Sequence, residues 1–144
     1  MTYIENLDAA LKKREDKIKY TITYCSSVDY SEIKLKIGID FPPKVKQYFD
    51  RIEHIKIESP RQFEILPLNK ICLFDAQFLF FSVINNEEKI CFDISHINDA
   101  DQWDIINFSN KYLITKTISS YLINKIWAWV DRDRMIWQEE FYSS

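Results

Sequence analysis

The side chains that could carry chemistry in this sequence are few and widely spaced. The candidate histidines and cysteines are His54, His96, Cys25, Cys72 and Cys91. Cys91 and His96 could act as nucleophile and base only if the chain folds back after Ile94. The alternative is a buried thiol, which behaves as a small apolar side chain, and an imidazole on the surface. The sequence favours this alternative, because nothing else near the pair completes a catalytic set.

The cysteines are odd in number and form no CxxC pair. A cysteine-based metal site is therefore not predicted, and reduced, buried thiols are expected rather than disulfides. Asp99 and Asp101 have the alternate spacing of calcium ligands. However, they lack the glycine and the later glutamate of an EF-hand loop. No cofactor or metal is predicted.

Acidic side chains concentrate in one segment, residues 87–104. This acidic segment carries a net charge of −5 in a chain of net charge −3. Its acidic residues are Glu87, Glu88, Asp93, Asp99, Asp101 and Asp104. Phosphate binding requires the opposite sign, so no direct nucleic-acid partner is predicted. A basic protein is the predicted partner, because complementary charge speeds encounter.

A merely solvated acidic face is the alternative explanation for the same segment. Asp93 is a special case within it, since Asp93 alternates with Phe92 and Ile94 along a predicted strand. One face of that strand either hides or exposes its carboxylate. The segment is therefore a candidate partner-binding surface, with Asp93 as its least certain member.

The elements that position this segment are predicted strands. Residues 77–84 are almost continuously apolar, which is typical of a central strand, and residues 89–95 return after an Asn85-Asn86 turn as a hairpin partner. Further strands are predicted at 54–59, 63–68, 103–108 and 112–115 by their alternating patterns. Residues 17–24 alternate similarly, although they could instead extend the first helix.

Helices are predicted at both ends of the sequence. Thr2 and Glu5 form a capping box for a helix over 3–14, and Asp29 and Glu32 form another for a helix that stops at Gly38. Pro43 is expected in the first turn of the next helix. A last helix after Thr117 buries one face, with Trp127 and Trp129 in the core rather than stacked on a ligand. The tail, residues 131–144, continues the helical period.

This order predicts one α+β domain over residues 1–144, with helices packed on a mixed or mainly antiparallel sheet. The longest apolar run, FLFFSVI at 78–84, is far shorter than the roughly 18 residues of a membrane helix. The first residues carry acids and no long apolar stretch, which predicts no secretion signal. A cytoplasmic protein without membrane contact is therefore expected.

The segment SVDYSEIKLKIGIDFPPKVKQYF, residues 27–49, resembles the entry motif of the SUKH superfamily. This superfamily includes fungal cell-wall assembly regulators and many bacterial proteins. The positions that match are Glu32, Ile33, Ile37, Gly38, Ile39, Phe41, Pro42, Tyr48 and Phe49. Downstream, QFEILPLNKI, KICFDIS and KTISSYLIN are similar to later family motifs. The sequence departs from the family at residues 50–53, where many members have Asn-Gly.

The resemblance implies a function by association. Many bacterial SUKH proteins of this size are immunity proteins, which bind and neutralise a cognate toxin domain, often a nuclease. The fold has no known shared catalytic set, so the resemblance implies a binding protein rather than an enzyme. The alternative is a regulatory or scaffolding module that binds a protein or peptide, as in the fungal relatives.

Overall fold

Eight strands form one sheet in the computed structural model, which describes residues 2–139. The strands are β1 (Lys19–Tyr24), β2 (Ile52–Ser59), β3 (Phe63–Ile65), β4 (Cys72–Phe74), β5 (Phe78–Ile84), β6 (Glu88–Asp93), β7 (Asp104–Asn107) and β8 (Leu113–Thr115). Their order is β1-β2-β3-β5-β6-β7-β8, and β4 pairs with the first half of β5. Every strand pairing among the described residues is antiparallel.

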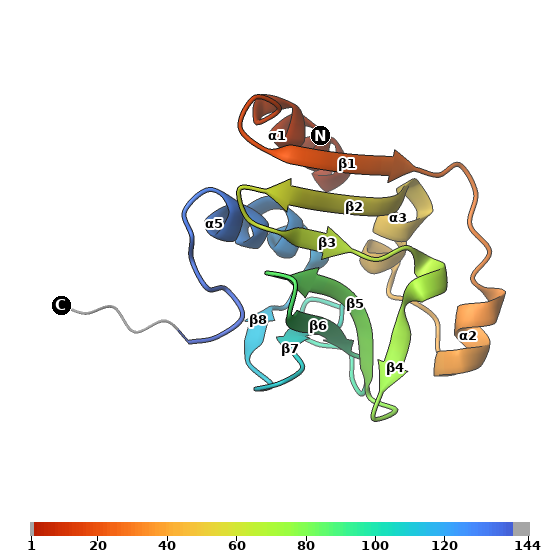
Figure 1. Ribbon diagram of the computed structural model, residues 1–144. Helices are drawn as coiled ribbons and strands as arrows, with labels where there is room; N and C mark the ends of the chain where they lie inside the picture. The colour runs from red at the N-terminus through yellow and green to blue at the C-terminus, as the bar shows by residue number, and fades with distance from the viewer. Residues whose placement is uncertain (1, 140–144) are drawn as a thin grey trace.

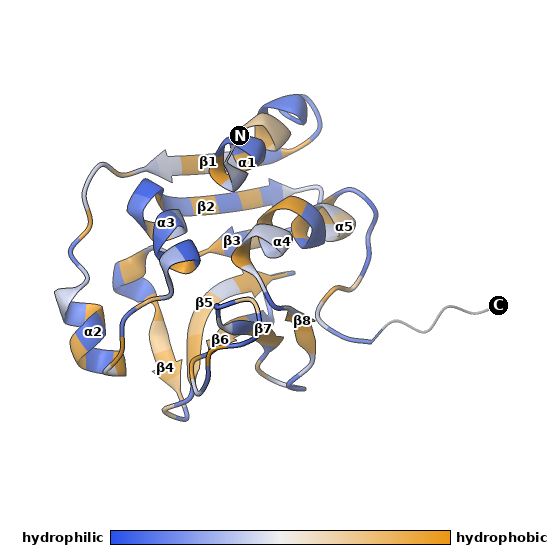
Figure 2. Ribbon diagram, turned by 180° about the vertical axis from the view of Figure 1, so that it is seen from behind, coloured by the Kyte–Doolittle hydropathy of each residue, from blue (hydrophilic) through white to orange (hydrophobic). Residues whose placement is uncertain are grey.

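The main helices lie on one face of this sheet. The helical elements are α1 (Tyr3–Lys13), α2 (Ser31–Ile37), α3 (Pro43–Arg51), the 3₁₀ turn η1 (Leu68–Lys70), and α4 (Ile118–Ser120), η2 (Tyr121–Lys125) and α5 (Ile126–Val130). The last three run on from one another, with η2 as a π-helical middle. Figure 2 shows α1, α3, α4 and α5 in front of the sheet, while α2 lies on the β4 side. The α+β prediction is confirmed.

The opposite face of the sheet, toward the viewer in Figure 1, carries none of α1, α3, α4 and α5. We call it the open face. Side chains alternate along a strand, so every second residue lies on the open face and its neighbours lie against the helices. The covered side forms the core: Leu79, Phe81 and Phe92 have no exposed surface, and Phe81 stacks on Phe92 at a centroid distance of 3.8 Å.

The predicted first helix and the predicted strand after it are both confirmed. Thr2 Oγ1 accepts from the Glu5 N–H, and the Glu5 carboxylate accepts from the Thr2 N–H, so the capping box is complete. Residues 19–24 form strand β1 instead of extending α1. The turn after Lys13 ends the helix, and β1 pairs with β2 over its whole length.

The second predicted capping box is wrong. Helix α2 begins at Ser31 with Tyr30 as its N-cap residue, and no side chain caps it. Asp29 instead accepts from the Ser31 N–H at 2.9 Å, a local turn that competes with capping. The stop is as predicted, because Gly38 has φ +76°, a left-handed conformation that costs other residues energy. Pro43 begins α3, also as predicted.

The central hairpin is confirmed. Strands β5 and β6 pair antiparallel from Phe78↔Asp93 to Ile84↔Glu88, and Asn85 and Asn86 turn the chain with positive φ. The register slips between Phe80 and Ser82. This bulge lets Phe81 and Ser82 both face the helices, where the Ser82 hydroxyl lies 2.7 Å from Tyr121 Oη.

Other boundaries differ from the predictions. The strand expected at 63–68 ends at Ile65, because Pro67 has no N–H for a ladder and the chain enters η1. Strand β4 was not predicted. The expected cap Thr117 accepts from the Ser120 N–H, but the helix ends at Val130. The helical tail prediction is therefore wrong for residues 131–139, and residues 140–144 lie outside the described part.

Candidate protein-binding surface

The C-terminal half of the open face is aromatic. Phe78 and Phe80 of β5 lie on the open face, and register places Phe74 of β4 beside Phe78 and Cys72 beside Phe80. Phe108, just after β7, folds over the same area. We call Phe74, Phe78, Phe80 and Phe108 the aromatic cluster. All four rings are partly exposed, in contrast to the fully buried phenylalanines on the covered side.

The rings of the aromatic cluster contact one another closely. Phe74 stacks on Phe80 with centroids 5.0 Å apart and planes 15° apart. Phe108 lies 4.8 Å from Phe74 and 5.8 Å from Phe78. Offset and edge arrangements at these distances contribute about 0.5–1.5 kcal/mol beyond the burial of area. The cluster is thus a small second apolar centre outside the core.

Two lysines of the chain lie over these rings. Lys111 Nζ is 4.0 Å from the centroid of Phe108 and 5.1 Å from that of Phe78. Lys89 Nζ is 5.7 Å from the centroid of Phe74. Such cation–π contacts are worth about 0.5–1 kcal/mol at exposed sites. The ring faces therefore already accept cations in the free protein.

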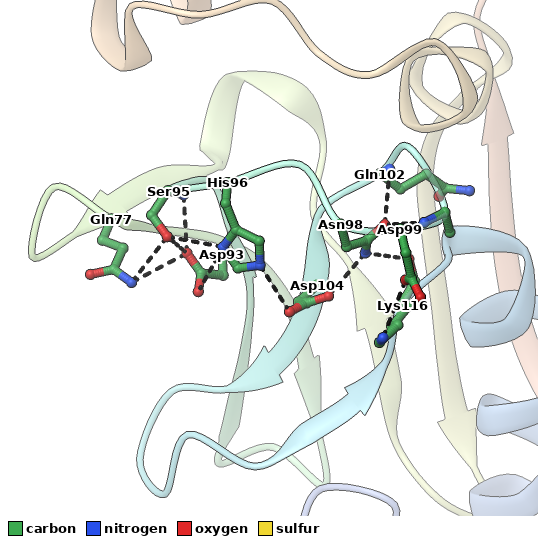
Figure 3. A network of polar contacts seen from close by, with 10 residues as sticks. Gln77, Asp93, Ser95, His96, Asn98, Asp99, Gln102, Asp104 and Lys116 are labelled. Carbon is green, nitrogen blue, oxygen red and sulfur yellow. Dashed lines mark hydrogen bonds and ion pairs between the residues drawn. The ribbon is translucent and has the colours of Figure 1, made fainter.

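Two predicted carboxylates lie at one end of the same face. Asp93 of β6 is the register partner of Phe78 on one side and of Asp104 on the other. His96, in the loop after β6, lies against both: Nδ1 is 4.0 Å from Asp93 Oδ2, and Nε2 is 3.3 Å from Asp104 Oδ2 (Figure 3). Half of the His96 side chain is exposed.

The other carboxylate oxygens are held by the protein itself. Asp93 Oδ1 accepts from Ser95 Oγ at 2.6 Å, from the Ser95 N–H at 3.0 Å and from Gln77 Nε2 at 3.3 Å. Burial opposes ionisation of Asp93, but these hydrogen bonds and His96 together hold the pKa of its carboxyl below its usual value. Asp104 Oδ1 accepts from Asn98 Nδ2 at 2.9 Å.

The loop between β6 and β7 is ordered by Asn98. Its Oδ1 accepts from the N–H groups of Ala100 and Gln102, and its Nδ2 also donates to the Lys116 carbonyl. Asp99 pairs with Lys116 Nζ at 3.2 Å, and Asp101 is exposed at a positive φ of 58°. Asp93, Asp99, Asp101 and Asp104 thus gather at one end of the sheet; we call them the aspartate end.

The structure does not bring the whole predicted acidic segment together. Glu87 is in the β5–β6 turn, and Glu88 is at the start of β6, about 17 Å along the strand from Asp93. Glu88 also lies on the covered side, because it is five positions before Asp93, an odd number, and side chains alternate between the two faces. Its carboxylate accepts from the buried Asn107 at 3.2 Å. The six acidic residues of the segment therefore form two separate groups, the aspartate end and the pair Glu87 and Glu88 at the other end of β6.

The geometry does not support Cys91 as a nucleophile with His96 as its base. Cys91 is buried on β6 between Phe80 and Ile106, and burial raises the pKa of its thiol to about 12. Such a thiol is not ionised near neutral pH, so it is a poor nucleophile. The expectation of buried thiols is wrong for Cys72, which is exposed, and Cys25 is half-buried. His54 lies elsewhere and contacts Glu64 at 2.6 Å.

Ser95 and His96 also do not form a working relay with Asp104. Ser95 Oγ lies 3.3 Å from His96 Nδ1, but its shorter contact is the hydrogen bond that it donates to Asp93. Within residues 2–139, no group of three histidine, cysteine, aspartate or glutamate side chains is placed to hold a metal ion. Trp127 and Trp129 are buried, as predicted, and Trp129 Nε1 donates to the Gln62 carbonyl.

A separate concavity lies between α2 and the β2–η1 side of the molecule. It has a volume of about 330 Å³, and its charged lining residues are Asp29, Glu32, Lys36 and Glu53. Lys36 pairs with Glu32 at 3.5 Å, so part of this charge is neutralised internally. This concavity is the main alternative to the open face as a binding site.

No family model matches the sequence, and no curated protein matches it. No helix within residues 2–139 has the length and apolar character needed to cross a membrane. The interpretation of the surface therefore rests on its residues and their geometry.

Proposed function

We propose that this protein is an immunity protein that binds and neutralises a cognate toxin domain, with the aspartate end as part of its binding surface. The observation that carries the proposal is the gathering of Asp93, Asp99, Asp101 and Asp104 at one end of the sheet, the first and last on neighbouring strands and the other two in the loop between them. The α+β fold agrees with the SUKH resemblance of residues 27–49, which supports the same function. The proposed partner is a basic protein, such as a nuclease.

Neutralisation would need no chemistry by this chain. A nuclease cleft is basic because it binds phosphates, so an acidic surface is attracted to it and blocks the substrate. The half-buried Asp93 and Asp104 are fixed by the protein's own hydrogen bonds, whereas Asp99 and Asp101 are exposed. The proposal includes a cytoplasmic location, which the free thiols support.

The acidic segment divides into the aspartate end and the pair Glu87 and Glu88, and this separation allows a test with an internal control. The gene adjacent to the one for this protein should be searched for a toxin domain, and cells should be challenged with that toxin. Asp99→Lys with Asp101→Lys should slow association about tenfold and weaken its salt dependence, because both charges are exposed. The variant Asp101→Lys alone is compared with the control Glu87→Lys, which reverses one charge at the far end of β6 and should associate at the wild-type rate.

Two outcomes would contradict the proposal in different ways. Equal slowing by the control would show that general charge, rather than the aspartate end, guides binding. No adjacent toxin and no protection by the wild-type protein would favour the alternative function, a regulatory or scaffolding module that binds another protein.

A further inference from the structure

The open face between β4 and β7 combines two kinds of side chain in register. One row across the strands is Phe74, Phe78, Asp93 and Asp104. The next row is Cys72, Phe80, Cys91 and Ile106. The ring of Phe78 therefore lies directly beside the carboxylates of Asp93 and Asp104. These carboxylates are on neighbouring strands, and such strands are about 4.8 Å apart.

Each carboxylate in the first row has one oxygen held by the protein and one turned toward His96. The held atoms are Asp93 Oδ1 and Asp104 Oδ1, which accept from Ser95, Gln77 and Asn98. The Oδ2 atoms have His96 between them, at 4.0 Å and 3.3 Å. Neither distance is that of a strong charged hydrogen bond, which is about 2.7–2.9 Å.

The apolar surface around this row is larger than the rings alone. Ile97, next to His96, is 54% exposed, and Leu113 of β8 is 42% exposed. Leu113 is the register partner of Ile106. Partly exposed rings with exposed aliphatic side chains beside them are typical of a protein-docking surface.

We propose that this face docks a segment of a partner protein that carries an arginine between apolar side chains. The arginine stem lies along Phe78, and its guanidinium replaces His96 between Asp93 and Asp104. The inference deepens the proposed function, because it names the chemistry of the partner at the same surface. It also extends the binding surface from the aspartate end to the aromatic cluster.

Arginine fits this row better than lysine does. A guanidinium is planar, stacks on an aromatic ring and donates from several N–H groups in a fixed fork. It can therefore contact Phe78 and the Oδ2 atoms of Asp93 and Asp104 at once when it takes the place of His96. The chain's own Lys111 lies over Phe78, yet no lysine within residues 2–139 forms an ion pair with Asp93 or Asp104.

A short peptide separates this inference from the proposed function. The probe is acetyl-Gly-Ser-Leu-Arg-Leu-Ser-Gly-amide, with otherwise identical peptides that carry lysine or citrulline instead of arginine. The full-length, ¹⁵N-labelled protein is titrated with each peptide to about 5 mM and followed by amide chemical shifts, since one short segment is expected to bind with millimolar affinity. The arginine peptide should shift the amides of Gln77, Phe78, Asp93, His96 and Asp104.

The expected ranking of affinities is specific. Citrulline should bind about tenfold more weakly, because it keeps the shape and loses the charge. Asp93→Asn with Asp104→Asn should cause a loss of the same size, about tenfold. Glu32→Gln with Glu53→Gln, in the separate concavity, is the matched control and should bind as wild type. The spectrum of each free variant shows whether it is folded.

His96→Ala sharpens the test, because it removes the side chain that occupies the proposed guanidinium position. It should raise the affinity for the arginine peptide about threefold, a gain that loss of a supporting contact would not produce. No shifts, shifts confined to the separate concavity, or equal binding of arginine and citrulline would overturn the inference. Arginine binding here without protection from a toxin would overturn the proposed function and leave this surface intact.

Discussion

The two halves of the open face differ in the kind of side chain that they expose to water. In the N-terminal half, on β1 to β3, polar side chains pair with one another: Lys19 with Glu58 at 3.5 Å, and His54 with Glu64 at 2.6 Å. In the C-terminal half, on β4 to β7, the aromatic cluster lies at the surface with lysines over its rings. We call these the polar half and the aromatic half.

The difference distinguishes a surface whose polar groups already have partners within the protein from a surface that is suited to bind another protein. Polar side chains in the polar half already have partners within the protein, so little would be gained by covering them. Rings in the aromatic half remain partly in water, and burying them against another protein would remove apolar area from solvent. A single sheet face can therefore carry both a solvated region and a docking region.

The largest expected contrast is in stability. Phe80→Ala in the aromatic half should lower the free energy of unfolding by about 2 kcal/mol, less than the 3–5 kcal/mol typical of a fully buried phenylalanine. Lys56→Ala, at an open-face position of the polar half, should change it by about 0.5 kcal/mol or less. Chemical denaturation of both variants measures the difference.

Phe81→Ala provides the upper reference, because Phe81 is fully buried and stacks on Phe92. This substitution should lower the free energy of unfolding by about 3–5 kcal/mol. If Phe80→Ala cost as much as Phe81→Ala, the aromatic half would be part of the core, and the contrast between the halves would fail.

The sequence predicts most of this framework, since period-two patterns and turn residues mark the strands directly. It predicts the β5–β6 hairpin because Asn85-Asn86 separates two apolar runs. Strand β4 is missed because its residues, Cys72, Leu73 and Phe74, are all apolar and show no alternation, and it pairs only with the start of β5. Without β4, Phe74 has no predicted place, and the aromatic cluster cannot be assembled from the sequence.

The acidic segment shows a second limit. Charge density along the chain identifies all six acidic residues but not the side of the sheet that each one occupies. The odd spacing between Glu88 and Asp93 could have predicted their opposite faces, given the strand. The return of Asp104 beside Asp93 depends on the β6–β7 register, which no local pattern specifies.

A smaller effect is expected at the boundary between the aromatic cluster and the aspartate end. Asp93→Asn should lower the free energy of unfolding by about 1 kcal/mol at pH 7, because the hydrogen bonds from Ser95 favour the charged form of the Asp93 carboxyl. The pKa of Asp93 is lowered by folding, so its contribution is present above the unfolded pKa and is lost as pH falls through the folded pKa.

The variant should therefore lose less stability than wild type when the pH is lowered from 7 to about 3. Urea denaturation at several pH values measures this difference. Asp101→Asn is the control for the loss of one negative charge, since Asp101 is exposed and lies outside the hydrogen bonds around Asp93. Parallel curves for wild type and Asp93→Asn would show that this carboxylate does not stabilise the fold.

The smallest expected effect separates the two halves by their response to salt. Double-mutant cycles should give coupling energies of about 0.5 kcal/mol for Lys19 with Glu58 and for Lys111 with Phe108. The first pair is exposed and purely ionic, so about 0.5 M NaCl should remove most of its coupling. The Lys111–Phe108 coupling should fall less, because Lys111 Nζ lies 4.0 Å from the ring centroid and its attraction to the ring acts at short range. Equal salt sensitivity in the two cycles would show that the aromatic half depends on charge as much as the polar half does.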